Sequence, residues 1–137
     1  MRMIETGVKD GKSCVVREVP VVHEGDDVSV VQFRHLATGS LEPRPEGKGE
    51  FVDIPVAPGD ALFYRVRFPA NQLRRVHYTD TIDCHTVVSG SIELLLDDGP
   101  HLLEAGDSAI VTGVDHGWKV GPQGCIVSMI VFGTPRP

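Results

Sequence analysis

Short runs of β-branched and other apolar residues alternate with polar residues along most of the chain, and clusters of glycine, proline and aspartate separate these runs. No stretch repeats apolar residues at the spacing of three and four that an amphipathic helix requires. The pattern predicts an all-β protein, a sandwich or a barrel. We expect strands at Ser13–Val22, Ser29–Leu36, Phe51–Val56, Ala61–Phe68, Leu73–Tyr78, Asp83–Val88, Ser91–Leu96, His101–Glu104, Ser108–Val111, His116–Val120 and Cys125–Phe132.

Turn residues between these runs predict how the strands connect. Val88–Ser91 reads Val-Ser-Gly-Ser between two alternating runs, which predicts a tight hairpin. Asp97–Pro100 reads Asp-Asp-Gly-Pro and predicts a second turn. The polar segment Gly39–Gly49 holds two prolines and three glycines, so we expect a loop there.

Composition narrows the class of protein. A chain of 137 residues with 41% hydrophobic and 23% charged residues fits one globular domain, residues 1–137. The net charge of −6 and the absence of a basic patch argue against nucleic acid as a partner. No apolar run reaches the length of a membrane span, and the N-terminus has no apolar signal region. The three cysteines match no zinc spacing and are typical of reduced thiols, so we expect a cytoplasmic protein.

Two motifs stand between residues 77 and 120. In the first, His77 is followed by Asp83 and, after six further residues, by Gly90. In the second, a Gly-Asp turn at Gly106 precedes Gly-x-x-His, which ends at His116. In this order and spacing, the chain resembles the cupin superfamily, and more closely a subgroup of small stand-alone cupins with the pattern His-x-Thr-x-Thr-Ile-Asp and Gly-x-x-His-x-Trp.

The resemblance implies a fold and a metal site. The fold is an antiparallel β-barrel of jelly-roll type, with residues 61–133 as the core barrel and residues 1–60 packing on it or extending it. His77, Asp83 and His116 take ligand positions, and a divalent transition metal such as Zn, Mn, Fe or Ni is the expected cofactor. Thr79 stands where the second histidine of the first motif is usual, so the ligand set is incomplete. No nucleotide cofactor is expected, because no glycine-rich nucleotide motif is present.

Strand alternation gives an independent interpretation of the same residues. Side chains two apart on a strand share a face, so six polar or aromatic side chains are expected inside the barrel. Such an interior needs a metal, a ligand or a hydrogen-bond network as partner. The six are His77, Thr79, Asp83, His85, His116 and Trp118.

Roles beyond the metal ligands remain alternatives at this point. His85 either acts in place of the missing histidine or is hydrogen-bonded to a core partner. Thr79 and Trp118 either contact substrate or pack the barrel. Arg65 and Arg67, with two arginines on the next predicted strand, either bind an anionic substrate or form ordinary surface pairs.

The leading hypothesis for function is an enzyme acting on a small oxygenated metabolite. The resemblance favours a lyase, a dehydratase or an isomerase, with His77, Asp83, His85 and His116 as catalytic candidates. A metal-dependent dioxygenase and a non-catalytic barrel that binds a small ligand are the alternatives. The apolar N-terminal strands have no role in the motif barrel, so we expect them to extend a sheet across a homodimer.

Overall fold

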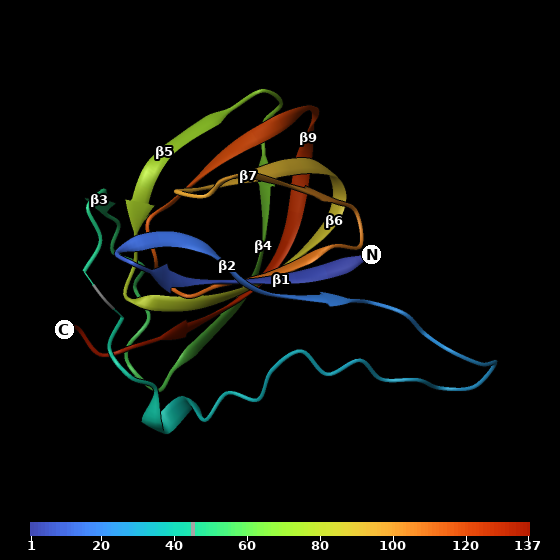
Figure 1. Cartoon of the computed structure of the whole chain (residues 1–137), viewed down its shortest axis with the longest axis horizontal. Coiled ribbons are helices and arrows are strands. Elements are labelled where there is room, and N and C mark those ends of the chain that lie inside the picture. The colour runs from blue at the N-terminus through green and yellow to red at the C-terminus, as the bar shows by residue number, and fades with distance from the viewer. Residues whose placement is uncertain (45) are drawn as a thin grey trace.

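The computed structural model describes residues 1–44 and 46–137, and the regular secondary structure within these ranges is nearly all β (Figure 1). A nine-stranded sheet has the order β2-β1-β8-β6-β9-β5-β3, with β4 paired to β9 and β7 paired to β6. All pairs are antiparallel except β1–β8 and β3–β5. The strands are β1 (Arg2–Lys9), β2 (Lys12–Pro20), β3 (Glu50–Phe51), β4 (Ala61–Phe68), β5 (Leu73–Tyr78), β6 (Thr81–Leu96), β7 (Gly99–Glu104), β8 (Ser108–Val111) and β9 (His116–Gly133).

Two long strands, β6 and β9, curl the sheet into a half-barrel (Figure 1). Each changes its outer partner along its length: β6 pairs first with β8 and then with β7, and β9 pairs first with β5 and then with β4. The bend lies at Gly90, where the register with β9 shifts. Gly90 has a φ of 73°, and a Cβ there would lie 2.0 Å from the carbonyl oxygen of Gly124. Only glycine is compatible with that geometry.

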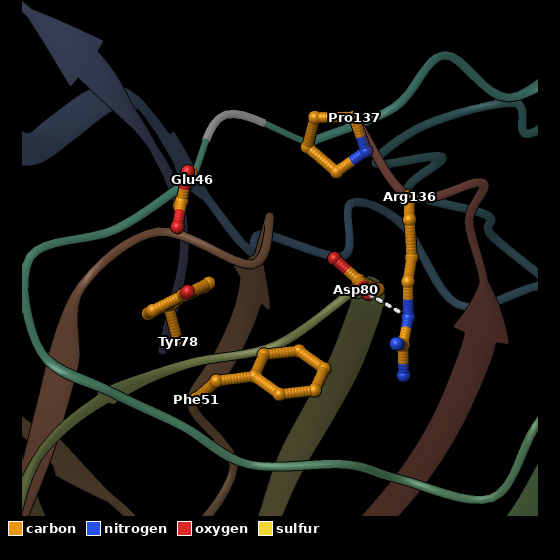
Figure 2. Close-up of a pocket in the computed structure, with 6 residues that line it drawn as sticks. All are labelled: Glu46, Phe51, Tyr78, Asp80, Arg136 and Pro137. Carbon is orange, nitrogen blue, oxygen red and sulfur yellow. Dashed lines mark ion pairs between the residues drawn. The ribbon is translucent and has the colours of Figure 1, made fainter.

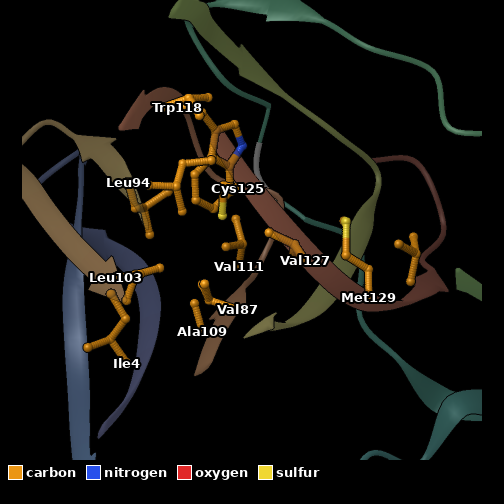
Figure 3. Close-up of a cluster of buried hydrophobic side chains, with 13 residues drawn as sticks. Ile4, Val87, Leu94, Leu103, Ala109, Val111, Trp118, Cys125, Val127 and Met129 are labelled. Carbon is orange, nitrogen blue, oxygen red and sulfur yellow. The ribbon is translucent and has the colours of Figure 1, made fainter. Parts of the chain in front are cut away.

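The hydrophobic core lies on the concave side, between the β6–β9 pair and the N-terminal strands (Figure 3). Ile4, Leu94 and Leu103 are fully buried there, and Val111 and Val131 close the cluster. Replacing one of these large side chains with alanine typically lowers the free energy of unfolding by about 2–5 kcal/mol. Trp118 and Met129 belong to this cluster and also line the cavity described below, so the core and the cavity share a wall.

The expected all-β class is confirmed, and so is the turn at residues 97–98. The N-terminal region differs from expectation. A strand at Arg2–Lys9 was not expected, and it lies inside the sheet between β2 and β8. Residues 29–36 form no strand, because no neighbouring strand pairs with them in the described chain. The expected strand at 51–56 shortens to Glu50–Phe51.

The predicted hairpin at Val88–Ser91 is wrong. The chain continues through these residues as one strand, and Gly90 marks a bulge instead of a reversal. The same holds in β9, where residues 121–124 link the two segments expected there. The described residues include one short helical turn, η1 (Thr38–Ser40), and no helix among them is long and apolar enough to cross a membrane.

Candidate functional site

A cavity of about 550 Å³ opens between β4, β5, β6 and β9. Its volume lies within the range of sites for small organic molecules. The side chains around it change from polar and aromatic in the interior to charged at the opening. They are Glu50, Val52, Ile54, Tyr64, Val66, Phe68, Leu73, Arg74, Arg75, His77, Thr79, Asp83, His85, His116, Trp118 and Met129.

Asp83 and His85 form the polar floor of the cavity. They are two residues apart on β6 and therefore share its inner face, as expected from strand alternation. Both are buried, and Oδ2 of Asp83 lies 3.9 Å from Nε2 of His85, beyond hydrogen-bond distance. Asp83 Oδ1 and His85 Nε2 have no hydrogen-bond partner among the described residues. Because buried polar atoms are nearly always paired, these two atoms indicate a place for a ligand group or a water molecule.

Burial sets the protonation of this floor. Loss of hydration raises the pKa of Asp83 from 3.8 to about 7, although a hydrogen bond with the Thr81 side chain acts in the opposite direction. Loss of hydration, together with the nearby His116, lowers the pKa of His85 to about 3. At neutral pH, His85 is therefore uncharged, and Asp83 is present both with and without its proton.

His77 and His116 form a second pair at the side of the cavity. The two residues face each other across β5 and β9, and their ring centroids are 4.3 Å apart at an interplanar angle of 54°. The Nδ1 atoms donate to the carbonyl oxygens of Arg75 and Val114, at 2.8 and 2.7 Å, so each ring keeps its Nε2 free to accept. Burial, and then the proximity of His77, lower the pKa of His116 to about 4, so this ring is also neutral.

The expected metal ligands do not fit a metal site in this arrangement. Among residues 1–44 and 46–137, no three His, Cys, Asp or Glu side chains are grouped so that they could hold a metal ion. The rings of His77 and His116 pack against each other, while Asp83 lies beside His85 on another strand. The set of His77, Asp83 and His116 lines one cavity, as expected, but does not converge on a common point.

The remaining expected interior residues also line the cavity. Thr79 is buried, and its hydroxyl lies 2.7 Å from that of Thr81. Trp118 is buried, with its ring 5.2 Å from that of His85 and 5.8 Å from that of His116. These contacts hold both imidazoles in place and give the cavity one aromatic wall.

Arg65 and Arg67 are not part of the cavity. They lie on the exposed outer face of β4, and the cavity is lined instead by Tyr64, Val66 and Phe68. Of the two alternatives for these arginines, binding a substrate in the cavity is therefore wrong, and a surface position is what the structure shows. Alternation in Ala61–Phe68 places Tyr64, Val66 and Phe68 on one face of the strand and both arginines on the opposite face, together with the exposed Phe63.

Tyr64 is the functional candidate that the motifs did not indicate. Burial, and then the negative charge of Asp83, raise the pKa of Tyr64, which keeps its hydroxyl protonated and able to donate. Tyr64 is on β4, which is separated by β9 from the strand that carries Asp83, and both residues line the cavity. A hydrogen-bond donor and a carboxyl group thus belong to the same site.

A second pocket, of about 240 Å³, lies near the C-terminus (Figure 2). Arg136 Nε pairs with Asp80 at 3.1 Å, and its guanidinium lies 5.1 Å from the centre of the Phe51 ring. Asp80 and Arg136 of this pocket are therefore already paired with each other. In this respect the pocket differs from the cavity, where buried polar atoms have none.

Comparison with known proteins finds likeness in structure alone. No family model matches the chain, and neither does any curated protein. The structure is similar to that of a cupin. This is an RmlC-like cupin from Shewanella frigidimarina, with 25% identity, a TM-score of 0.46, and coverage of 56% of this chain and 68% of that one.

Two further solved structures are similar over about the same share of this chain. An HTH_3 family transcriptional regulator from Vibrio cholerae has 18% identity and a TM-score of 0.46, with coverage of 56% of this chain and 44% of the regulator. KdgF from a Halomonas species has 18% identity and a TM-score of 0.45, with coverage of 53% and 70%. The chain thus spans less than half of the regulator's length.

Proposed function

We propose that the protein is an enzyme that moves a proton on a small oxygenated molecule held in the cavity, as a dehydratase or related lyase. The observation that supports this proposal most is made at the floor of the cavity. There, Oδ1 of the buried Asp83 and Nε2 of the neighbouring His85 both lack a hydrogen-bond partner among the described residues. A buried group without partners lowers stability. Its position in a cavity of substrate size favours a functional role.

The proposed chemistry needs one residue to accept and return a proton. Ionised Asp83 removes a proton from a carbon next to a carbonyl group, and the electron pair of the C–H bond moves toward the carbonyl oxygen. The neutral hydroxyl of Tyr64 stabilises the charge on that oxygen. Protonated Asp83 then gives the proton to the hydroxyl on the neighbouring carbon, the C–O bond breaks, a C=C bond forms and water leaves. Asp83 is again ionised, and no further reactant is consumed.

An isomerase would use the same first step and return the proton to a different carbon. The neutral rings of His85 and His116 supply hydrogen-bond acceptors and no positive charge. They therefore orient the substrate and do not act as acids. Because the donor set does not fit a metal ion, no step of this mechanism passes through one.

The experiment follows exchange of a substrate C–H with solvent deuterium. A panel of small 3-hydroxy carboxylic acids, each with a keto group two carbons beyond the hydroxyl carbon, is monitored in D₂O by proton NMR, and loss of water by mass spectrometry. The wild-type protein is expected to catalyse exchange or dehydration of at least one compound. Asp83→Asn is expected to lower the rate by about 10²–10⁴-fold. Arg67→Ala, on the outer face of β4, is the matched control and keeps the wild-type rate.

Two results would overturn the proposal. Exchange that persists in Asp83→Asn would place the base elsewhere. Saturable binding of these compounds with neither exchange nor water loss would identify the protein as a non-catalytic binding barrel.

A further inference from the structure

Strand β5 carries two consecutive arginines, Arg74 and Arg75, that both line the cavity. In a regular strand, neighbouring side chains point to opposite faces, and one of the two would point away. The exception has a visible cause. Arg74 pairs with Trp118 of β9 and His77 pairs with His116, so three steps along β5 match two steps along β9. The extra residue is a β-bulge, which turns side chains toward a site.

Gly117 makes this bulge possible. It lies in β9 between the two paired residues, directly against the bulge. A Cβ at this position would be 2.8 Å from the carbonyl oxygen of Arg74, closer than side-chain carbons are found. The glycine within the sequence His-Gly-Trp therefore lets β5 approach β9 closely with its extra residue.

The two guanidinium groups are free to meet a ligand. Both arginines are exposed while also lining the cavity, which places them at its opening. Neither forms an ion pair with any of the residues that the structure describes. The other charged side chain at the opening is Glu50, so the opening carries two positive charges and one negative charge. This excess contrasts with the net charge of −6 for the whole chain.

We propose that Arg74 and Arg75 bind the carboxylate of an anionic substrate at the opening of the cavity. The substrate class is a small hydroxy carboxylate with a separate keto group, so that its charged end lies at β5 and its reacting end, next to the keto group, reaches Asp83. The guanidinium fork suits a planar carboxylate, which it binds through two hydrogen bonds. This inference rests on the proposed function in assigning a reacting end, but binding alone tests it.

Trp118 gives the readout. It is the only tryptophan in the chain, and it lines the cavity, so its fluorescence reports ligands that enter. The probes are short and medium-chain 3-hydroxy carboxylates and their matching amides, measured at about pH 8, where the acids are fully ionised. Each amide keeps the shape of its acid and removes the charge.

The wild-type protein is expected to bind at least one acid about tenfold or more tightly than its amide. The double variant Arg74→Gln/Arg75→Gln is expected to lose this preference while its affinity for the amide stays unchanged. Arg65→Gln/Arg67→Gln, which removes the same charge from the outer face of β4, is expected to keep the preference. Thermal unfolding of both variants checks that they remain folded.

Three outcomes would overturn the proposal: equal affinity for acid and amide in the wild-type protein, equal loss in the two double variants, or no fluorescence response to any acid. The proposed function is judged separately. Asp83→Asn is expected to retain the preference for acids while losing turnover. The experiments can therefore contradict the proposed carboxylate binding by the arginines without contradicting the proposed catalysis by Asp83, and the reverse.

Discussion

Oδ2 of Asp83 lies 3.9 Å from Nε2 of His85, both side chains are buried, and neither the second oxygen of Asp83 nor that nitrogen has a partner in the described residues. The two groups are too far apart to satisfy each other and near enough to contact one ligand together. The function that we propose is based on this relationship, and several measurable consequences follow from it.

The first consequence concerns stability and pH. The folded-state pKa of Asp83, about 7, lies above its unfolded value of 3.8, so the folded state holds this proton more tightly. The stability that Asp83 contributes is fully present below about pH 4 and is lost as the pH rises through 7. The titratable groups facing it are Tyr64 from β4, His85 on its own strand, and His77 and His116 from β5 and β9.

Asp83→Asn removes this dependence. The free energy of unfolding of Asp83→Asn minus that of wild type is expected to increase by on the order of 4 kcal/mol between about pH 4 and pH 8. Urea unfolding across this range measures it, and Asp97→Asn, at the turn between β6 and β7, serves as a control. A difference that does not change with pH would mean that Asp83 has an ordinary pKa.

The second prediction concerns His116. The side chain of His116 is 2% exposed and packs against Trp118. His116→Ala is therefore expected to lower the free energy of unfolding by about 2–4 kcal/mol. His77→Ala, which removes the more exposed ring of the pair, is expected to cost less. Equal costs in urea unfolding would contradict this account of the pair.

The third prediction concerns metal. Because the described residues include no three-ligand group, treatment with a chelator followed by dialysis is expected to leave the melting temperature and ligand binding unchanged. Metal content is measured on the same sample by mass spectrometry. Loss of stability or binding on chelation, restored by one divalent ion, would show that the histidines rearrange around a metal.

The fourth prediction concerns assembly. Val28 and Val30 are 90% and 84% exposed in a strand-like sequence that pairs with no strand of the described chain, and the segment extends away from the sheet (Figure 1). We expect this segment to pair with an edge strand of a second copy, such as β2. Light scattering is expected to show a dimer for the wild-type protein and a monomer for Val28→Asp/Val30→Asp. A wild-type protein that is monomeric at micromolar concentration would exclude this pairing between two copies.

Sequence patterns predicted the parts of the fold that depend on local alternation. Eight of the strands and the inner face of β6 follow from side chains two apart sharing a face, which is why Asp83 and His85 were expected together. Gly90 was misinterpreted because glycine is common to both tight hairpins and bulges, and the choice depends on the partner strand. The bulge at Arg74 is likewise decided by the approach of Gly117 from β9, which local sequence does not reveal.

The sequence predicted which residues line the cavity but not how their side chains are arranged. His77, Thr79, Asp83, His85, His116 and Trp118 all line the cavity. Motif spacing does not determine whether imidazoles converge on a metal or stack on each other, because that depends on ring rotation and on carbonyl acceptors such as those of Arg75 and Val114. For Arg65 and Arg67, alternation along β4 decides between the two alternatives and places both on the surface.

The proton-transfer role of Asp83 is the central claim, and the protonation of its carboxyl group tests it most directly. With aspartate labelled at the side-chain carboxyl with ¹³C, the NMR signal that disappears in Asp83→Asn belongs to this residue. Its chemical shift is expected to titrate near pH 7 and to change when a 3-hydroxy carboxylate is added. A signal that titrates near pH 4 and does not respond to any ligand would contradict the account.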